Sequence, residues 1–284
     1  MKIFITGSKG FIGRELVLQC QKQGMEVLQA DLPEADICSK DIANLIPEGV
    51  DAVIHLAALS RDADCKNKAP ECFNINVMGT LNLMRVAEEK KVKQFIFASS
   101  EWVYDNCNAN EIKNEESLIN IANHKSEYAL SKLVSEANLR QKYQNGFCPV
   151  TILRFGIVYG QRKDNWSAVE SLFNSVKTQD EIKIGSLKTG RCFIYVSDIA
   201  SGIIKSIGLD GFDIINLEGD KLITLGDIIG ESKKIFDKNL KITETDPDNQ
   251  SVRNISNEKA KKILKWNPEI NLEAGLKLLL LYGK

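Results

Sequence analysis

The sequence lacks the features that mark several classes of protein. It contains only two histidines, no Cys-x-x-Cys pair among its seven cysteines, and no apolar run near the roughly 18 residues that span a bilayer. Basic and acidic residues nearly balance, at 37 and 38, and no long Lys/Arg run is present. We therefore expect no metal site, no disulfide framework, no membrane segment and no nucleic-acid partner. The start of the chain also lacks a secretion signal, so we expect a cytoplasmic protein.

The chain opens with an apolar segment that is followed at once by three glycines. Residues 2–6 are apolar enough for a buried strand, and Gly7, Gly10 and Gly13 precede a helical segment. Gly7 would allow a tight turn, Gly10 would let backbone N–H groups approach a pyrophosphate, and Gly13 would let the helix pack closely. A helix N-terminus carries partial positive charge that favours phosphate. This pattern predicts a dinucleotide-binding turn.

A second expected strand, over residues 25–30, ends at Asp31. A carboxylate at this position can accept hydrogen bonds from both ribose hydroxyls of adenosine, and it would repel a 2′-phosphate. The sequence therefore favours NAD over NADP. The alternative is that Asp31 only opens a turn with Pro33.

Apolar strands alternate with long amphipathic helices over the first half of the chain. Further strands are expected at 51–57, 94–99 and 149–155, and helices at 73–90 and 126–143, with shorter apolar pieces at 181–185, 193–196 and 213–217. This alternation predicts an α/β fold, a Rossmann-like doubly wound parallel sheet with a smaller C-terminal substrate-binding lobe. We expect an NAD-binding domain over 1–160, with strands contributed from about 190–217, and a substrate-binding lobe mainly over 161–284. Ligands should bind beyond the carboxyl ends of the strands.

One helix and one strand end carry candidate catalytic groups. Tyr128-Ala-Leu-Ser-Lys132 places a phenol and an ammonium one turn apart on one helix face. A nearby cation lowers a tyrosine pKa towards neutral pH and makes the phenol a general acid or base. Ser99 and Ser100 end a strand at the sheet edge, where a hydroxyl could hold a substrate alcohol against Tyr128. The alternative for the Tyr-x-x-x-Lys pair is an ordinary amphipathic helix.

With these motifs in order, the chain resembles the extended short-chain dehydrogenase/reductase family of NAD-dependent sugar-nucleotide epimerases and dehydratases. The matching segments are Thr6–Gly13, which includes Phe11 and Ile12, Asp36–Ile37, His55–Ala58, Asn76–Thr80, Ser99–Tyr104, Tyr128–Lys132, Arg154–Gly160 and Arg191–Asp198. The resemblance covers nearly the whole chain and depends on the order and spacing of these segments.

The resemblance implies a role for each matching residue. The catalytic residues would be Ser100, Tyr128 as acid/base, and Lys132, which also binds the nicotinamide ribose. The cofactor site would comprise Gly7, Gly10, Phe11, Ile12, Gly13, Asp31, Asp36, Ile37, Leu56, Ala57, Ala58, Ser99, Tyr128 and Lys132. Asn76 would steady the active-site backbone, although a solvated or helix-capping role is an alternative. For the Leu56–Ala58 run, the alternative is core packing, and His55 is expected to be a satisfied core residue or to lie near the cofactor.

Departures from the family pattern limit what can be said about the substrate. Dehydratases of the family carry Thr-Asp-Glu where this chain has Ser100-Glu101-Trp102, which disfavours dehydration. Glu101 is either an acid near the sugar or a loop carboxylate facing water, and Trp102 provides packing or a wall for sugar stacking. Family members that grip a nucleotide diphosphate often have Asn and Pro where this chain has Ile157 and Gln161.

Two arginines nevertheless suit a nucleotide-linked sugar. By resemblance Arg191 would meet the diphosphate. The family's later Arg-x-Gly-Asp element is not recognisable, although Arg253 lies nearby. The alternative is that Arg162 and Arg191 are plain surface charges. The substrate-binding residues are therefore expected to be Ser100, Glu101, Trp102, Arg191 and Arg253. The expected activity passes through a keto sugar, at C4, as a 4-epimerase or 4-keto reductase. The alternatives are a dehydrogenase of a free sugar or uronic acid, and a non-catalytic dinucleotide-binding regulator. Family likeness also implies a homodimer formed through the helices near 70–90 and 126–143.

Overall fold

The chain folds into two compact units, which the computed structural model describes over residues 1–104 and 111–281. Of the described residues, unit 1 comprises 1–104, 118–155 and 200–215, and unit 2 comprises 111–117, 156–199 and 216–281. The boundary expected from the sequence lies near residue 160, and residues 111–117 were not expected in the second unit.

Unit 1 contains a sheet of mostly buried strands. Its elements are β1 (Lys2–Thr6), α1 (Phe11–Lys22), β2 (Glu26–Ala30), η1 (Lys40–Asn44), β3 (Ala52–His55), α2 (Asp62–Cys65), α3 (Ala69–Phe73), η2 (Asn74–Met78), α4 (Gly79–Glu89), β4 (Phe95–Ser100), η3 (Glu101–Val103), η4 (Ile121–Asn123), α5 (Glu127–Gln144) and β5 (Val150–Phe155). Together with β10 (Phe212–Leu217) the strands form a six-stranded sheet in the order β10-β5-β4-β3-β1-β2. The pairs β1–β2, β1–β3, β3–β4 and β4–β5 are parallel. The expected doubly wound parallel sheet is confirmed.

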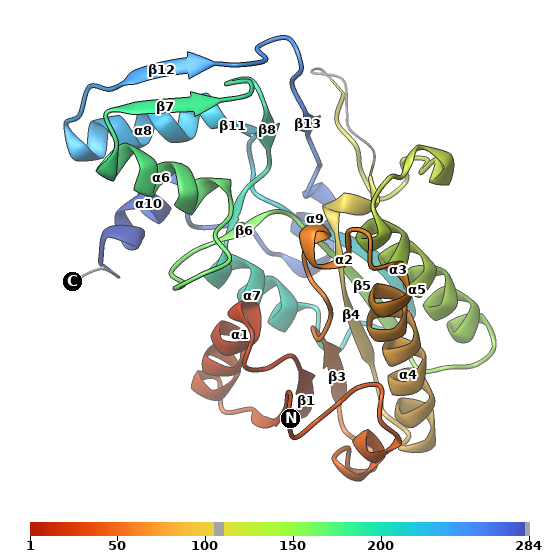
Figure 1. Cartoon of the computed structure of the whole chain (residues 1–284). Helices are drawn as coiled ribbons and strands as arrows, with labels where there is room; N and C mark the ends of the chain where they lie inside the picture. Colours follow the sequence, from red (N-terminus) through yellow and green to blue (C-terminus); the bar gives the residue numbers. More distant parts are fainter. Residues whose placement is uncertain (105–110, 282–284) are drawn as a thin grey trace. The chain divides into compact units, whose positions relative to one another are not determined.

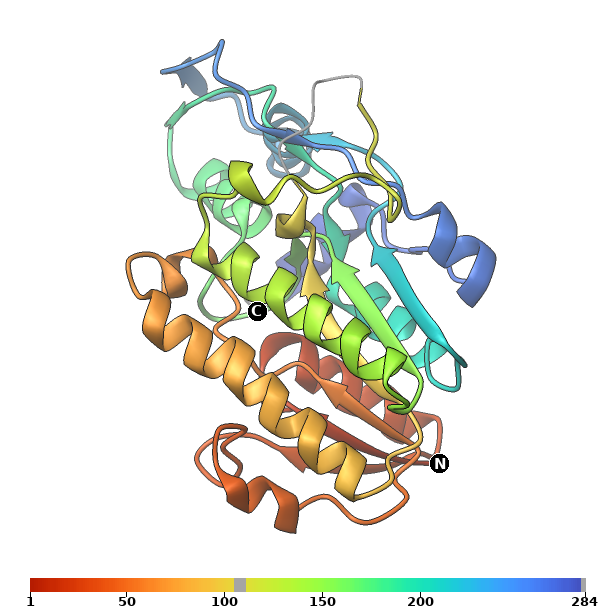
Figure 2. The same cartoon turned by 90° about the vertical axis from the view of Figure 1, so that its right-hand side faces the viewer.

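Helices cover both faces of this sheet, as Figure 1 and Figure 2 show. The helices α4 and α5 lie on one face, and α1 lies on the other. Every residue of β4 and β5 is buried, which is why these strands read as continuous apolar runs. The core between the layers includes Phe4, Leu83, Phe95, Leu139 and Ile152.

The helix expected over 73–90 is interrupted. It consists of α3, a π-helical segment η2 over Asn74–Met78, and α4 from Gly79. A π-turn widens a helix locally and is often found at functional sites. Here it turns the Asn76 side chain into the core, where only 2 % of the residue is exposed. This interruption could not be predicted from the sequence, because a wider turn leaves the apolar pattern of the flanking helices intact.

Unit 2 is built from short strands and amphipathic helices. The remaining elements of the chain are β6 (Val158–Tyr159), α6 (Ala168–Thr178), β7 (Glu181–Ile184), β8 (Gly190–Arg191), β9 (Ile194–Tyr195), α7 (Val196–Lys205), β11 (Ile223–Thr224), α8 (Leu225–Phe236), β12 (Lys241–Glu244), β13 (Val252–Arg253), α9 (Glu258–Leu264) and α10 (Leu272–Leu281). Side-chain capping boxes begin α6 at Ser167 and α8 at Thr224. These two helices and the β7–β12 pair share an apolar core that contains Val176, Ile182 and Ile229. Over the residues described, no helix has both the length and the apolar character to cross a membrane.

The buried imidazole of His55 should make stability depend on acid pH. His55 accepts or donates hydrogen bonds with Thr6 (2.8 Å) and Thr80 (3.0 Å) and is 1 % exposed. Burial, aided by the charge of Lys132, lowers its pKa from 6.5 to about 3. The unfolded chain therefore binds the proton more readily, and stability is lost as the pH falls from 6.5 towards 3.

Within that pH window, we expect His55 to make the free energy of unfolding decrease by about 1.4 kcal/mol more for each unit that the pH falls. Urea unfolding at several pH values would measure the slope for wild type and for His55→Gln. His124→Gln, which changes the chain's other histidine, is the matched control. Equal slopes for wild type and His55→Gln would contradict the prediction.

Candidate active site

The glycine-rich loop has the shape that a dinucleotide requires. Gly7 adopts φ +70°, and a methyl group there would lie 2.8 Å from the backbone nitrogen of Ala57. A methyl group at Gly13 would overlap the carbonyl oxygen of Gly7. The helix α1 begins at Phe11 without a side-chain cap from Gly10 and without an acidic residue in its first turn. The glycines therefore let the loop pack closely against the backbone after β3 and against the start of α1, and the helix N-terminus presents a positive end that suits phosphate.

The carboxylate of Asp31 lies directly beside this loop. Its two oxygens accept hydrogen bonds from the backbone nitrogens of Lys9 (2.7 Å) and Leu32 (2.8 Å). The turn expected after Asp31 is present, since its carbonyl oxygen accepts from the nitrogen of Ala35 at 2.8 Å. Asp31 thus forms the turn, and its carboxylate lies at the end of β2, where it would bind the ribose hydroxyls.

The Asp36–Ile37 pair divides its side chains between solvent and core. Asp36 is exposed and accepts a hydrogen bond from the backbone nitrogen of Cys38 at 2.8 Å. Ile37 is buried, and a methyl group at Gly79 would lie 2.7 Å from its Cδ1 atom. Contact of this pair with adenine remains a prediction.

The segment after β3 is held by Asn76. Leu56, Ala57 and Ala58 are half-buried, unlike the four buried residues of β3. The amide oxygen of Asn76 accepts a hydrogen bond from the backbone nitrogen of Leu59 (2.8 Å). The amide nitrogen of Asn76 donates to the carbonyl oxygen of Leu59 (3.1 Å) and to Ser131 Oγ (3.0 Å). Asn76 is therefore a buried brace for this backbone, and its alternative as a solvated residue is wrong.

The three expected catalytic residues come together in unit 1. Tyr128 and Lys132 lie one turn apart on α5, and Ser100 ends β4. Tyr128 and Ser100 share a side-chain hydrogen bond. Ser100 Oγ also accepts from the backbone nitrogen of Trp102 at 3.3 Å. Lys132 Nζ donates to the carbonyl oxygen of Ala98 at 2.7 Å.

The pKa of Tyr128 differs from the expectation. Burial raises it from 10 to about 12; the hydrogen bond with Ser100 lowers it, and the charge of Glu101 raises it further. The expected lowering by Lys132 is wrong for this structure, because the ammonium donates to Ala98 and lies 5.9 Å from the Tyr128 ring centroid. The phenol is therefore protonated at neutral pH, as a proton donor must be.

Glu101 and Trp102 are both near Tyr128. Glu101 has no exposed surface, so the alternative of a loop carboxylate facing water is wrong. The short helix η3, which Ser100 caps, turns the Glu101 side chain inward instead. Trp102 packs with Tyr128 and Leu59, which agrees with the packing role expected for it.

A disulfide joins Cys65 to Cys72 in the same cluster. The scattered cysteines led us to expect no disulfide framework, and this single pair, seven residues apart, was not predicted. The short helices α2 and α3 fold against each other and bring the two Cα atoms to 5.1 Å. Cys20, Cys38, Cys148 and Cys192 remain thiols, and Cys107 lies outside the described residues.

In unit 2, Arg191 and Arg253 are neighbours on adjacent parallel strands. They are register partners in the β8–β13 pair. Arg191 donates to the carbonyl oxygens of Gly190 and Ser251, both at 2.7 Å, and to Ser251 Oγ at 2.9 Å. The structure thus brings together the two arginines expected to bind substrate, and it anchors Arg191 in a fixed orientation.

Sequence reasoning missed a buried ion pair next to the catalytic residues. Arg154 donates to both carboxylate oxygens of Glu136, at 3.0 and 2.6 Å, and to the hydroxyl of Tyr104 at 2.8 Å. Ser99 Oγ donates to Glu136 at 2.5 Å. The available signal was the position of Glu136, four residues after Lys132 on the same helix face as Tyr128.

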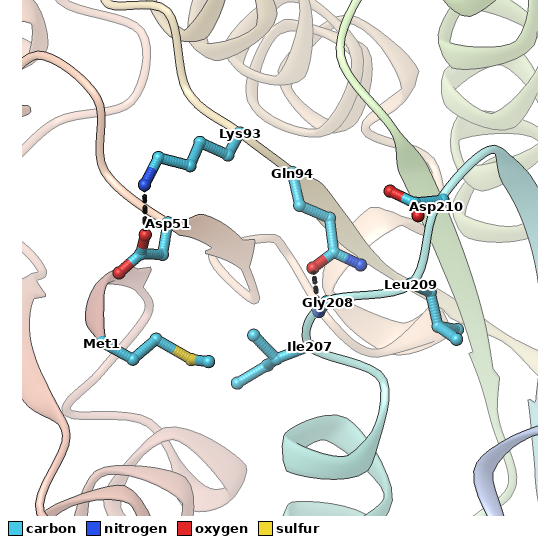
Figure 3. A pocket seen from close by; sticks show the side chains of 8 residues that line it. All are labelled: Met1, Asp51, Lys93, Gln94, Ile207, Gly208, Leu209 and Asp210. Atoms are coloured by element: carbon cyan, nitrogen blue, oxygen red, sulfur yellow. Dashed lines mark hydrogen bonds and ion pairs between the residues drawn. The ribbon is translucent and has the colours of Figure 1, made fainter.

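A cavity of about 260 Å³ lies at the opposite end of the strands of unit 1. Figure 3 shows its lining, which comes from the starts of β1, β3 and β4 and from the loop over residues 207–210. Gln94, which lines it, forms hydrogen bonds with Thr151 Oγ1 (3.0 Å), the oxygen of Ser206 (2.9 Å) and the nitrogen of Gly208 (2.7 Å). These bonds tie the loop to β4 and satisfy the amide, so the cavity is structural and separate from the candidate site.

The fold, the glycine loop and the Ser-Tyr-Lys set define an enzyme of the extended short-chain dehydrogenase/reductase type. The chain matches the NAD dependent epimerase/dehydratase family over residues 3–217, and it belongs to this family. The suspected resemblance is confirmed, and the cofactor is NAD.

Relatives extend over nearly the whole chain. A UDP-glucuronate 4-epimerase of Thermodesulfobacterium geofontis is 30 % identical, over 99 % of this chain and 95 % of the relative. A UDP-glucuronic acid decarboxylase of Arabidopsis thaliana is 25 % identical, over 98 % of this chain and 88 % of the relative.

Solved structures agree with this fold. The UDP-glucuronic acid 4-epimerase of Bacillus cereus, solved with UDP-glucuronic acid and NAD, superimposes with a TM-score of 0.86 at 25 % identity, over 99 % of this chain and 98 % of that one. The UDP-glucose 4-epimerase of Thermus thermophilus, solved with NAD, has a TM-score of 0.85 at 22 % identity, over the same shares of the two chains.

Proposed function

We propose that the protein is a nucleotide-sugar 4-epimerase that oxidises C4 of a UDP-linked sugar and reduces the resulting ketone from the other face. The observation that carries this proposal is the convergence of Tyr128 on Ser100 beside Lys132 at the carboxyl end of β4. UDP-glucuronate is the first candidate substrate, because the relative at 30 % identity carries that activity in its name.

The chain's own residues would position the sugar and move its proton. Ser100 would hold the C4 hydroxyl. Tyr128, which is protonated in this structure, would first have to lose its proton to solvent; its phenolate would then take the proton of the C4 hydroxyl and return it after reduction. Bound NAD supplies the hydride acceptor, and an epimerisation returns the hydride, so no net oxidation occurs. Lys132 would stabilise the phenolate before it takes that proton, because it is a cation on the same helix face.

We propose that Arg191 and Arg253 bind the diphosphate. Their register pairing makes the two arginines neighbours on adjacent strands, and a guanidinium group suits bidentate contact with phosphate oxygens. This chain has Ile157 and Gln161 where family members that bind a nucleotide diphosphate often have Asn and Pro. Because those two residues are replaced, Arg191 and Arg253 are the principal candidates for contact with the diphosphate.

Incubation of the purified protein with UDP-glucuronate, UDP-glucose and the corresponding free sugars, with and without NAD, tests the proposal. We expect the C4 epimer of one UDP-sugar to form without net NADH, as read by NMR of the products. NADH formation on free sugars would instead indicate a free-sugar dehydrogenase, and release of CO₂ from UDP-glucuronate would indicate a decarboxylase. NAD binding without turnover of any sugar would indicate a non-catalytic regulator.

We also propose a homodimer through α4 and α5. The two helices lie side by side on one face of the sheet (Figure 2). Met78 at the start of this surface is 56 % exposed and Val134 on α5 is 36 % exposed, so apolar side chains remain for a partner copy to cover. Sedimentation at micromolar concentration should give twice the chain mass of 31.7 kDa; a monomeric mass would exclude this arrangement.

A further inference from the structure

One face of α5 contacts three consecutive residues of β4. Lys132 donates to the carbonyl oxygen of Ala98, Glu136 accepts from Ser99 Oγ, and Tyr128 bonds with Ser100. The helix residues 128, 132 and 136 are spaced by four, so they project from the same side of the helix. Tyr128 and Lys132 are accounted for by the proposed reaction. Glu136 is the third member of this row, and the reaction as proposed assigns it no role.

Glu136 is held in place from two strands. Only 6 % of Glu136 and 4 % of Arg154 are exposed. Arg154 on β5 is the register partner of Ser99 on β4, and both donate to the Glu136 carboxylate. Such an ion pair is costly to bury, and replacing it with apolar side chains is often neutral for stability. The position of Glu136, one helical turn after Lys132 on α5, points to a role other than stability.

We propose that Glu136 is a positioning residue for catalysis, whose buried carboxylate keeps Lys132 in its ammonium form and fixes Ser99, and through it Ser100, at the end of β4. The catalytic part of this inference rests on the proposed oxidoreductase function. Its electrostatic part, the charge of Lys132, can be measured without any substrate.

The surroundings of Lys132 explain why a carboxylate is needed. Lys132 is 4 % exposed, and its Nζ lies 4.7 Å from the centroid of the Phe97 ring. Burial lowers its pKa from 10.5 to about 8, and the charge of Glu136 acts in the opposite direction. Without that charge the lysine would lose its proton nearer to neutral pH.

The other titratable and charged groups near Lys132 do not replace Glu136. They are His55 on β3, Tyr128 on α5, Glu101 on η3, and Arg154 on β5. His55 and Tyr128 are neutral at pH 7, because burial lowers the pKa of His55 to about 3 and raises that of Tyr128 to about 12. Glu101 acts on Tyr128, and Arg154 carries positive charge, which opposes that of Lys132. Glu136 is thus the carboxylate that stabilises the ammonium.

The test is Glu136→Gln, read first by NMR of protein labelled with ¹³C at the lysine Cε. The Lys132 signal, assigned with Lys132→Arg, should titrate with a midpoint lower by about one pH unit. The pH above which kcat falls should be lower by the same amount, with KM little changed. At pH values above the Lys132 midpoints of both proteins, kcat of the variant should therefore be about tenfold lower than that of wild type. Glu136→Asp, which keeps the charge, should restore the pH dependence of wild type.

The matched control is Glu170→Gln. Glu170 is also a buried carboxylate paired with an arginine, Arg162, at 2.8 Å, but it lies in unit 2. We expect it to lower stability without moving the Lys132 midpoint. If Glu136→Gln fails to fold, the double variant Glu136→Gln/Arg154→Met is compared with Arg154→Met alone, and the midpoint should be lower in the double variant.

An unchanged Lys132 midpoint in a folded Glu136 variant would overturn the inference. A shifted midpoint in a protein that turns over no sugar would leave the electrostatic role of Glu136 in place and would overturn the proposed function instead. The two failures are therefore distinguishable.

Discussion

Tyr128→Phe is expected to lower kcat by a factor of about 10² to 10⁴ while NAD binding is retained. The ring of Tyr128 packs against Trp102 and the Cys65–Cys72 pair, and phenylalanine keeps that packing. The substitution removes only the hydroxyl, which bonds with Ser100 and would exchange the proton with the sugar. KM should change little, because the lost interaction belongs mainly to the transition state.

Tyr143→Phe is the matched control, since it makes the same change on the same helix. Tyr143 packs on Phe212, with ring centroids 5.6 Å apart, outside the candidate site. Steady-state kinetics on the substrate found by the sugar panel, together with NAD titration, would separate chemistry from cofactor binding. A Tyr128→Phe enzyme with kcat within a few-fold of wild type would show that another group carries the proton.

Much of the fold and part of the site could be predicted from the sequence, because both depend on local patterns. Continuous apolar strands between helices predicted the parallel sheet, and the glycine spacing predicted the turn that Gly7 forms at φ +70°. Tyr128 and Lys132 were found for the same reason, since residues four apart on a helix share a face. Ser100 followed from its place at a strand end, where parallel sheets present their functional groups.

The features that the sequence did not predict depend on contacts between distant segments. The ion pair of Glu136 with Arg154 joins α5 to β5, and no short-range pattern encodes that pairing. The Cys65–Cys72 disulfide depends on how two short helices fold against each other. The pKa of Tyr128 was misjudged because helix spacing gives the distance to Lys132 but not the burial, which raises the pKa. Burial and long-range pairing therefore decide the chemistry of groups that local patterns only locate.

Arg154→Met should cost about 3–5 kcal/mol of unfolding free energy, because it leaves the Glu136 carboxylate buried without its counter-charge. The side chains of Arg154 and Glu136 are 4 % and 7 % exposed, so solvent screens the pair little. Urea unfolding at neutral pH would measure the loss. Arg85→Met is the control, since Arg85 pairs with Glu89 at the surface, where the side chains are 46 % and 51 % exposed, and its loss should cost at most about 1 kcal/mol.

The double variant Glu136→Leu/Arg154→Met separates the cost of an unpaired charge from the worth of the pair. Two apolar side chains in place of the ion pair should recover most of the stability that Arg154→Met loses, because no charge then remains buried. Activity should fall below that of Arg154→Met, which keeps Glu136, since Lys132 then lacks its carboxylate neighbour. A double variant with the stability of wild type and the kcat of Arg154→Met would show that the pair serves the fold alone.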